Sequence, residues 1–401
     1  MELVKLIGWI LFYTVNVFFA LHFVIPFLLF LLHQILPKST ETLLNRYKII
    51  TEKNFHFAAI ITAHQDARFI GPLVDSFLKQ NYQHFTVYVV ADDCDIADLK
   101  FSDPRIILLK PNTALHAKIK SIKYAVDHFE RRHDALIIFD SDNLIHPDFL
   151  LKMNRYFQKG FRVVQANMLS KNLDTTFSKL DTLGHTYHNF LERQVKMEMG
   201  VTSAILGLGV AIDIPLYNEV MYTNELGGFD KKLQVQLALK LPTIAYAKDV
   251  IVFDEKVESG AAFEKQRTRW IFTYFEYFSD SLKLFLNGLF HFHPGRLLLG
   301  FNMLRPPMFL TIGISLLLTI LCFIINPLYG WIWIGIFILY TLNFILIVTT
   351  QSQQKGVSSA IVYIPSMVLR QIKSLLKIKS AKKSFLKTEH RKVIYIEELL
   401  R

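Results

Sequence analysis

Cysteine is scarce in this sequence, and two long stretches contain no charged residue. The 401 residues include only Cys94 and Cys322, which excludes a disulfide framework and favours chemistry that faces a reducing compartment. No Asp, Glu, Lys or Arg occurs in residues 6–36 or in residues 306–354. Because 52% of all residues are hydrophobic and 20% are charged, this segregation excludes a disordered chain and a purely soluble enzyme. It indicates a globular domain held between membrane segments.

The uncharged stretches are long enough to cross a membrane. About 20 helical residues span a hydrocarbon core of ~30 Å, and the sequence predicts membrane helices at 6–32, 306–326 and 330–350, with a turn at Asn326-Pro327. The apolar segment 356–369 is shorter and is predicted to be interfacial or re-entrant. The predicted order is a membrane helix (1–36), a cytoplasmic linker (37–54), a globular domain (55–270), amphipathic interface helices (271–300), two membrane helices (301–350), and an interfacial segment with a basic tail (351–401).

Positive charges indicate the orientation in the membrane. Lys and Arg residues follow the first predicted helix, precede the second and follow the third, whereas the short loop around Asn326 has no charge. This pattern places the globular domain and the tail in the cytoplasm and the N-terminus outside, in an integral protein of the plasma or inner membrane. Residues 370–401 hold ten Lys or Arg and three Glu, so +7 of the net +11 lies there. Such a tail favours anionic membrane lipids as partners over nucleic acid.

The region between the membrane segments alternates between strand and helix patterns. Short apolar runs predict strands at 57–63, 85–91, 105–110 and 135–139, and helical patterns occur at 72–79 and 117–131. Apolar strands separated by helices indicate an α/β fold with a mostly parallel sheet covered on both faces. Ligands bind beyond the carboxyl ends of the strands in such sheets, and three polar clusters lie there: Thr62–Arg68, Asp92–Asp95 and Asp140–Asn143.

Two of these clusters contain paired carboxylates. In Asp140-Ser141-Asp142 the carboxylates are two residues apart and directly follow a buried strand. There they could share Mg²⁺ or Mn²⁺ with the phosphate oxygens of a substrate. The alternative for this triplet is a helix cap and turn cluster. Asp92-Asp93 has the same ambiguity, since it could cap a helix or accept hydrogen bonds from a base or a ribose.

An aromatic segment with two arginines lies shortly before the second predicted membrane helix. Gln266-Arg267-Thr268-Arg269-Trp270 opens this amphipathic stretch. One interpretation is an interfacial helix with snorkelling Arg side chains and a Trp at the level of the lipid headgroups. The other interpretation is a sugar-stacking Trp beside an Arg that binds a diphosphate.

In their order along the chain these motifs resemble the family 2 glycosyltransferases, in particular the membrane branch with the cellulose, chitin, hyaluronan and poly-N-acetylglucosamine synthases. The resemblance covers about residues 55–290 and implies a GT-A fold, whose sheet is Rossmann-like and mostly parallel. It implies a nucleotide-sugar site at Thr62, Ala63, His64, Asp66, Asp92, Asp93, Lys118, Asp140 and Ser141. Asp140 and Asp142 match the metal-binding D-x-D motif, and Gln266, Arg269 and Trp270 match the Q-x-x-R-W motif for the acceptor and the diphosphate.

The motif of the catalytic base departs from the family pattern. Where members usually have Thr-Glu-Asp, this sequence has Gly228-Phe229-Asp230, so the resemblance implies Asp230 as the general base with Phe229 in place of the Glu. Glu225 is a second candidate base, and Asp254-Glu255 is a third, for which capping is the ordinary explanation. Gly207-Leu208-Gly209 resembles the small-residue lining of the acceptor site, with a glycine-permitted bend in a strand as the alternative.

The resemblance implies an inverting transfer from a nucleotide-diphosphate sugar, most often UDP-linked, to a glycan or a lipid-linked acceptor, with Mg²⁺ or Mn²⁺ as cofactor. Processive synthesis and single transfer both stay open. Three membrane helices are few for a polymer channel, so a partner subunit for export is a further expectation. A non-catalytic subunit that binds nucleotide sugar or glycan is the alternative. A transporter would need ionisable residues within its membrane helices, where only His22 and His33 occur.

Overall fold

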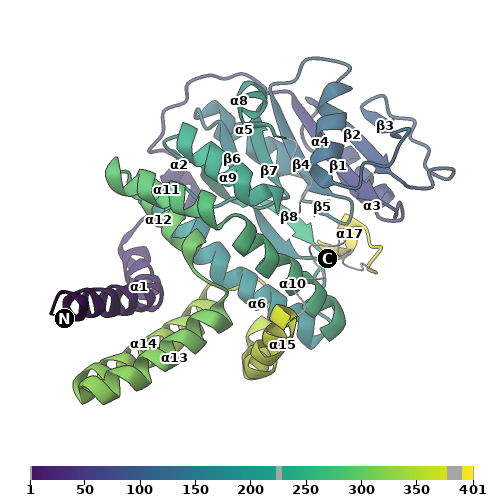
Figure 1. The fold of residues 1–401 in the computed structure, drawn as a ribbon. Coiled ribbons are helices and arrows are strands. Elements are labelled where there is room, and N and C mark those ends of the chain that lie inside the picture. The colour runs from purple at the N-terminus through teal and green to yellow at the C-terminus, as the bar shows by residue number, and fades with distance from the viewer. Residues whose placement is uncertain (1, 223–227, 377–390, 401) are drawn as a thin grey trace.

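An eight-stranded sheet lies at the centre of the structure, a computed structural model that describes residues 2–222, 228–376 and 391–400 (Figure 1). The strands are β1 (Phe57–His64), β2 (Phe85–Asp92), β3 (Ile106–Leu109), β4 (Ala135–Asp140), β5 (Leu144–Ile145), β6 (Val163–Ser170), β7 (Val210–Asp213) and β8 (Ala245–Asp254). In the order β3-β2-β1-β4-β7-β6-β8-β5, neighbours are parallel except that β7 is antiparallel to β4 and β6, and β5 is antiparallel to β8. The predicted mostly parallel α/β sheet is confirmed.

Helices cover both faces of this sheet. The globular part contains α2 (Thr40–Leu44), α3 (Ile70–Leu78), α4 (Lys118–Asp127), α5 (Phe149–Gln158), α6 (Thr176–Asn189), the π-helix η1 (Phe190–Gln194), α7 (Val195–Met199), α8 (Ile214–Val220) and α9 (Phe229–Lys240). On β1, Ala59 and Ile61 share a buried cluster with α3 and α5, whereas Ala58 and Ile60 share another with α4, α8 and α9. Because successive side chains of a strand point to opposite faces, a strand buried on both sides needs a continuous apolar run.

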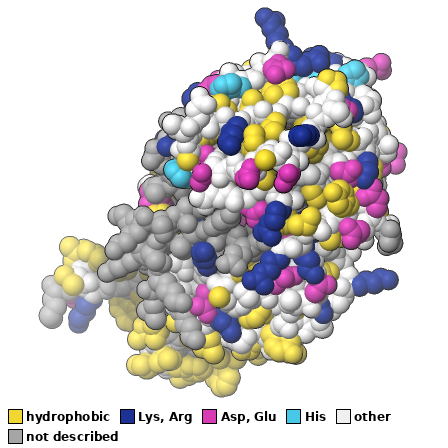
Figure 2. Space-filling view, turned by 90° about the vertical axis from the view of Figure 1, so that its right-hand side faces the viewer, with side chains coloured by type: hydrophobic (Ala, Val, Ile, Leu, Met, Phe, Trp, Pro, Cys, Tyr) yellow, Lys and Arg dark blue, Asp and Glu magenta, His cyan; other side chains and the backbone are white. Residues whose placement is uncertain are grey.

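Three helices of the described chain are long and apolar enough to cross a membrane: α1 (Glu2–Ile35), α13 (Met308–Ile325) and α14 (Pro327–Thr350). They pack as one bundle, in which Asn16 Oδ1 of α1 accepts hydrogen bonds from Cys322 Sγ of α13 at 3.3 Å and from Trp333 Nε1 of α14 at 2.9 Å. Polar side chains shared in this way join helices in an apolar medium. Figure 2 shows apolar side chains gathered at the lower margin of the molecule, with charged side chains spread over the globular part above. These features support membrane association.

The third membrane helix begins earlier than the sequence pattern predicts. It was expected at residue 330, and α14 begins at Pro327. The Asn326 side chain accepts a hydrogen bond of 2.9 Å from Leu328 N and so caps the first turn. Proline suits the first helical position because its fixed φ is helical and it has no N–H to satisfy. The predicted turn therefore shrinks to the single residue Asn326 between α13 and α14.

The membrane bundle is attached to the globular part through α6 and η1. Leu29 of α1 and Ile347 of α14 lie in one buried cluster with Phe190 of η1. Arg305, which directly precedes the apolar stretch of α13, donates a hydrogen bond of 3.1 Å to Glu192 of η1. Both side chains are mostly buried, so removal of either partner would leave an uncompensated charge. These contacts fix the bundle relative to the sheet.

Three helices connect β8 to the second membrane helix: α10 (Gly260–Glu276), α11 (Phe278–Phe290) and α12 (Pro294–Leu304). The hairpin of α11 and α12 is closely packed, because a Cβ on Gly288 would lie 2.2 Å from Leu297 N and a Cβ on Gly300 would lie 2.5 Å from Phe285 N. At its tip Phe292 is 92% exposed. An exposed apolar tip suits an interface helix, and that role of α11 and α12 stays a prediction.

The C-terminal region consists of two described parts. The first forms the 3₁₀-helix η2 (Val357–Tyr363) and α15 (Ile364–Leu376), which pack against α6 and α10. The predicted interfacial segment therefore contacts the globular domain. Residues 377–390 of the basic tail lie outside the described residues. Residues 391–400 return to the sheet, where α17 (Ile396–Leu399) lies beside β5 and β8 (Figure 1), so the end of the chain belongs to the globular domain rather than to a free tail.

A histidine pair at the amino ends of β1 and β4 predicts acid sensitivity of the fold. His56 Nδ1 and His133 Nδ1 are 3.0 Å apart, and His133 Nε2 lies 2.9 Å from Tyr88 Oη. Burial lowers the pKa of each imidazole to about 4. Because the unfolded chain takes up these protons at about pH 6.5, we expect full stability above that pH and a progressive loss as the pH falls from ~6.5 to ~4.

Thermal unfolding in detergent across this pH range measures the effect. His133→Gln should flatten the pH dependence, because it removes one of the two groups that take up protons on unfolding. The matched control is His128→Gln, at an exposed position of the same region, which should keep the wild-type profile. An identical pH profile for the wild type and His133→Gln would show that this pair does not set the acid limit.

Candidate active site

Asp92 connects the loop after β1 to the loop before α4, both of which belong to the predicted nucleotide-sugar site. Its carboxylate accepts hydrogen bonds from Leu115 N at 2.7 Å and from His116 N at 3.0 Å, and it lies 2.8 Å from His64 Nδ1. Asp92 is only 1% exposed. A buried carboxylate of this kind is stable because backbone N–H groups and a ring nitrogen satisfy it. The structure therefore gives Asp92 a role in positioning the loop that leads into α4, and its predicted contact with a nucleotide stays a prediction.

Left-handed backbone conformations gather around Asp92. Gln65, Asp93 and His116 have φ values of +58°, +53° and +55°, although none is glycine. Such conformations persist where the surrounding structure enforces them, and they concentrate at functional sites. Gln65 Nε2 donates a hydrogen bond of 2.8 Å to Asp93 Oδ2. Asp93 is exposed, in contrast to Asp92, so its carboxylate is the one accessible to a ligand.

The remaining residues of the predicted nucleotide loop differ in accessibility. Thr62 Oγ1 donates a hydrogen bond of 3.2 Å to Phe139 O, which ties β1 to β4. Ala63 is 2% exposed and serves the core. Asp66 accepts two hydrogen bonds from the Arg68 guanidinium, at 2.7 and 2.9 Å. This part of the loop is therefore built mainly by contacts within the chain.

Lys118 joins the D-x-D motif to the glycine stretch. At the first position of α4, its Nζ donates hydrogen bonds to Asp140 Oδ1 at 2.6 Å and to Gly207 O at 2.7 Å. The Lys118 and Asp140 side chains are 21% and 38% exposed, so both can be reached from solvent. The ammonium group thus lies where a diphosphate beside Asp140 would meet it.

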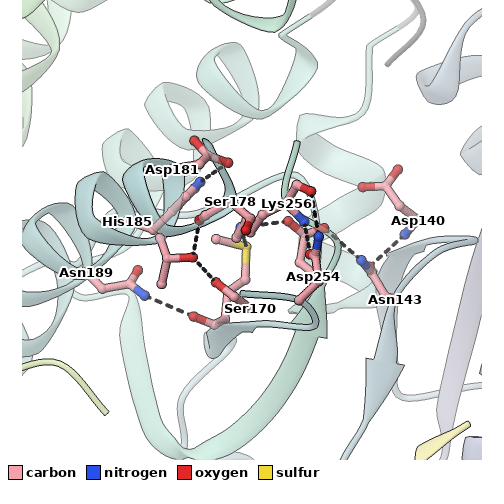
Figure 3. Close-up of polar contacts among 12 residues, drawn as sticks. Asp140, Asn143, Ser170, Ser178, Asp181, His185, Asn189, Asp254 and Lys256 are labelled. Carbon is pink, nitrogen blue, oxygen red and sulfur yellow. Dashed lines mark hydrogen bonds and ion pairs between the residues drawn. The ribbon is translucent and has the colours of Figure 1, made fainter. Parts of the chain in front are cut away.

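A chain of polar side chains, whose connection the sequence does not reveal, supports the D-x-D loop. Asp140 N donates a hydrogen bond of 2.9 Å to Asn143 Oδ1, and Asn143 Nδ2 donates one of 3.0 Å to Asp254 Oδ1. Lys256 Nζ lies 2.8 Å from Asp254 Oδ2. In Figure 3 the chain runs from Asp140 through Asn143 to Asp254 and Lys256, while the Asp140 carboxylate points away from it. Ser141 lies half-buried in the turn after Asp140.

The D-x-D loop contains two carboxylates that could bind a metal ion, those of Asp140 and Asp142. Asp142 is 5% exposed, and its backbone carbonyl accepts a hydrogen bond of 3.1 Å from Lys171 Nζ. Among the described residues no group of three or more His, Cys, Asp or Glu side chains is placed to hold a metal. Mg²⁺ binds through one or two carboxylates when substrate phosphates and water complete its shell. The donor set of Asp140 and Asp142 therefore fits a divalent ion that arrives with a diphosphate.

Asp230 lies at the amino end of α9, beside the glycine stretch. A Cβ on Gly207 would lie 3.8 Å from Asp230 Cβ and 3.4 Å from the Phe229 ring. Phe229 is 7% exposed and packs in the core, with Lys118 Nζ 5.6 Å from its ring centroid. The Phe that replaces the usual Glu is thus a packing residue, while the half-buried Asp230 borders the same glycine as Lys118.

Arg269 connects α10 to both carboxylate sites. Burial lowers the pKa of its guanidinium, and the nearby negative charges of Asp140 and Asp230 act in the opposite direction. Gly228, with φ +80°, brings the start of α9 against α10, since a Cβ there would lie 2.1 Å from Thr273 Cγ2. Of the two arginines in the Q-x-x-R-W motif, Arg269 is the one whose charge interacts with both Asp140 and Asp230, whereas Arg267 interacts with Asp181.

Trp270 and Gln266 complete the motif on α10. Trp270 is 37% exposed, and the Arg267 guanidinium lies 4.1 Å from its ring centroid. Arg267 donates a hydrogen bond of 2.6 Å to the buried Asp181, and the His185 ring meets Trp270 edge-on at 6.0 Å. Arg267 thus points into a buried cluster with Asp181 and His185 beside the Trp270 ring, and the sequence pattern had indicated a snorkelling role for Arg267 and none for Asp181 or His185. Gln266 Oε1 is buried and has no hydrogen-bond partner among the described residues.

Of the other candidate bases, only Asp254 and Glu255 lie within the described residues. Glu225 lies outside the described residues. Asp254 is bound by Asn143 and Lys256, and the Glu255 carboxylate accepts hydrogen bonds from backbone N–H groups near the C-terminus. Both therefore have structural partners, although these are an amide side chain, a lysine and the N–H groups of residues 391 and 392 rather than the first turn of a helix.

Comparisons with known proteins bear on the family and the fold of the chain. The family model described as glycosyltransferase-like family 2 matches residues 54–273. The structure is similar to that of the mannosyltransferase PcManGT from Pyrobaculum calidifontis in complex with GDP-Man and Mn²⁺, with a TM-score of 0.53, 13% identity, and coverage of 92% of this chain and 99% of that one. TarS residues 1–349 from S. aureus in complex with UDP-GlcNAc gives a TM-score of 0.44 at 14% identity, with 84% and 93% covered. No curated protein sequence matches. At these identities the PcManGT similarity shows the fold alone.

The contact between Gly228 and Thr273 gives a test of how α9 is placed. Gly228→Ala should lower the unfolding temperature and reduce turnover by roughly 10²-fold, because the new Cβ displaces α9 from α10 and shifts Asp230. Adding Thr273→Ser removes the methyl group that the Cβ would meet and should recover part of both losses. Thermal unfolding and turnover of the single and double variants measure this, with Thr273→Ser alone as control. A double variant no better than Gly228→Ala would refute the contact.

Proposed function

This chain belongs to the glycosyltransferase-like family 2, a family of inverting hexosyltransferases, and we propose that it transfers a sugar from a nucleotide-diphosphate donor to a glycan or lipid-linked acceptor. The observation that carries this proposal is the position of Lys118, whose ammonium group donates hydrogen bonds to Asp140 and to the carbonyl of Gly207, the glycine that borders Asp230. One cation thus serves the side of the site that would hold the diphosphate and the side that would hold the acceptor hydroxyl.

Lys118 and Arg269 are the proposed ligands of the diphosphate. Both are cations beside Asp140, one on α4 and one on α10. When the bond to the sugar breaks, negative charge grows on the leaving diphosphate, and positioned cations stabilise it. Asp140 and Asp142 would hold Mg²⁺ or Mn²⁺, which supplies further positive charge at the diphosphate. Asp93 and His64 are proposed contacts of the nucleoside.

Asp230 is the proposed general base. Inversion takes place in a single displacement, so the acceptor hydroxyl attacks the anomeric carbon while its proton passes to a carboxylate. Support comes from the place of Asp230 at the start of α9, next to Gly207, whose carbonyl binds Lys118. The lack of a side chain lets Asp230 lie close to the backbone of Gly207. Gly207 is therefore proposed to line the acceptor site.

The acceptor is proposed to reach the site along α10. Trp270 is 37% exposed and is proposed to contact a sugar ring with the part of its indole that Arg267 leaves uncovered. Gln266 Oε1 is buried without a hydrogen-bond partner among the described residues and is proposed to accept one from a sugar hydroxyl of a bound acceptor. The donor is proposed to be UDP-linked. Since the related fold of PcManGT is described with GDP-Man, GDP-linked sugars belong in the same test panel.

The proposed location is the cytoplasmic face of the membrane. The three apolar helices and the distribution of Lys and Arg support this orientation. The exposed tip of the α11–α12 hairpin, with Phe290 and Phe292 72% and 92% exposed, is proposed to lie in the headgroup layer. A partner subunit would be needed for polymer export.

Asp230→Asn is the direct test of the base. The carboxamide cannot take up the proton, so turnover should fall by about 10²–10⁴ while nucleotide binding is kept. Glu225→Gln is the matched variant for the second candidate base and should stay active. The measurement is nucleotide release from purified protein with UDP- and GDP-sugars, Mn²⁺ or Mg²⁺, and lipid or oligosaccharide acceptors.

Two outcomes would contradict the proposal. Wild-type turnover by Asp230→Asn would remove Asp230 from the mechanism. Binding of donors without turnover, with every acceptor and unchanged by Asp230→Asn, would favour the alternative of a non-catalytic subunit that binds nucleotide sugar or glycan. The altered base motif at Phe229 is the observation that keeps this alternative open.

Cysteine labelling tests the proposed orientation. Both native cysteines are buried, so a membrane-impermeant maleimide should react mainly with introduced sites. Leu328→Cys, in the exposed first turn of α14, should be labelled in intact cells. Lys100→Cys, on the exposed surface of the globular domain, should be labelled only after the cells are opened. The reverse pattern would show that the globular domain faces outward.

A further inference from the structure

The end of the chain is seated on the edge of the sheet that carries the D-x-D loop. Residues 391–400 lie beside β5 and β8, far from α15 in Figure 1. β5, with Leu144 and Ile145, begins two residues after Asp142. A displacement of β5 would therefore also displace the adjoining loop with Asp140 and Asp142, the proposed metal ligands.

The first contact is apolar. Ile396 is 1% exposed and shares a buried cluster with Leu144 of β5 and Phe253 of β8, which pair in the antiparallel register of these strands. Ile394 and Leu399 pack around this cluster. β5 has only two residues: Leu144 belongs to this cluster, whereas Ile145 lies in the main core and its N–H donates a hydrogen bond of 3.4 Å to Ser76 Oγ of α3. Ile396 thus covers the outer side of the segment that follows the D-x-D motif.

The second contact is polar and involves Glu255, directly after β8. Its carboxylate accepts hydrogen bonds from Arg391 N at 2.6 Å and from Lys392 N at 3.1 and 3.2 Å. Lys392 Nζ lies 2.8 Å from Asp174 Oδ2 and anchors the segment further. Glu255 is 4% exposed, so these N–H donors satisfy a carboxylate that has little access to water.

A buried lysine links Glu255 to the D-x-D loop. Lys171 Nζ donates a hydrogen bond of 3.1 Å to the backbone carbonyl of Asp142 and lies 3.9 Å from Glu255 Oε2. Lys171 and Asp142 are each 5% exposed. The Lys171 ammonium group lies between the Asp142 carbonyl and the Glu255 carboxylate. The strength of its hydrogen bond to Asp142 therefore depends on how completely the N–H groups of Arg391 and Lys392 satisfy Glu255. Loss of those donors would draw Lys171 toward Glu255 and away from Asp142.

We propose that residues 391–400 are a positioning element of the active site, which holds the loop of Asp140–Ile145 in place through Ile396 on β5 and through Glu255 and Lys171 on Asp142. The segment touches no substrate atom in this account and acts through the loop. The inference rests on the proposed function for its effect on metal and donor binding, while the structural coupling itself is independent of it.

The first measurement is hydrogen–deuterium exchange of the ligand-free, full-length protein. Ile396→Ala and a chain that ends at residue 390 should exchange about tenfold faster at residues 143–145, the factor that corresponds to loss of about 1.4 kcal/mol. α4 (Lys118–Asp127) is the internal reference for global unfolding. Glu397→Gln is the matched control, because Glu397 forms an exposed ion pair with Lys79, the residue that follows α3. Its exchange should equal that of the wild type.

The second measurement is the dependence of Mn²⁺–UDP binding and of turnover on Mn²⁺ concentration. The half-saturating Mn²⁺ concentration should rise about tenfold in Ile396→Ala, while kcat at saturating Mn²⁺ stays within about threefold of the wild type. A general loss of folding would lower kcat instead. Glu397→Gln should show the wild-type Mn²⁺ dependence.

The outcomes separate the two proposals. Unchanged exchange at residues 143–145 in both Ile396→Ala and the shortened chain overturns the positioning role, whatever the activity. Faster exchange with an unchanged Mn²⁺ dependence also overturns it, because the loop would then not be coupled to the metal. Wild-type protein that turns over no donor refutes the proposed function alone, since exchange and Mn²⁺–UDP binding are measured without transfer.

Discussion

The site depends on one constraint, which is that the negative charges gathered at the ends of the strands, on the solvent-accessible Asp140 as well as on the buried Asp92 and Asp142, must be balanced by groups of the chain itself. The guanidinium of Arg269, largely removed from water itself, acts on both Asp140 and Asp230, and Lys118 and Lys171 bind Asp140 and the backbone of Asp142. Charges in such surroundings interact more strongly than at an exposed surface. The cations are therefore structural partners in the free protein and, on our proposal, are ready to stabilise a diphosphate without large rearrangement.

The same helix that supplies Arg269 also couples the site to the membrane bundle. α10 carries Trp270 and Arg269 and continues through the α11–α12 hairpin into α13. On the other side, α6 and η1 contribute Asp181 to the Trp270 cluster and Glu192 to the pair with Arg305. The proposed acceptor side of the site is thus built from the elements that contact the membrane helices, as expected for an acceptor that is lipid-linked or exported.

Much of the fold could be predicted because strong local patterns determine it. β1, β2 and β4 begin where the apolar runs begin, and each extends one residue further, onto the polar residues His64, Asp92 and Asp140, because strand pairing continues there. The candidate site residues could be predicted because the motifs follow one another in the order that is typical of family 2 glycosyltransferases. Local sequence does not encode the antiparallel β7, the use of Asp92 as a loop support, or the contact of Lys171 with Asp142 and Glu255. These depend on residues distant in the chain, and the final apolar residues, after a basic stretch, had no pattern that pointed to β5.

The central claim is that Lys118, Arg269 and Asp230 surround one nucleotide sugar, and an experimental structure with a non-transferable donor and Mn²⁺ tests it most directly. The account predicts diphosphate oxygens within hydrogen-bond distance of Lys118 Nζ and the Arg269 guanidinium, with the anomeric carbon facing Asp230 across Gly207. A donor bound with its diphosphate away from Lys118 and Arg269, or with its anomeric carbon facing away from Asp230, would contradict it.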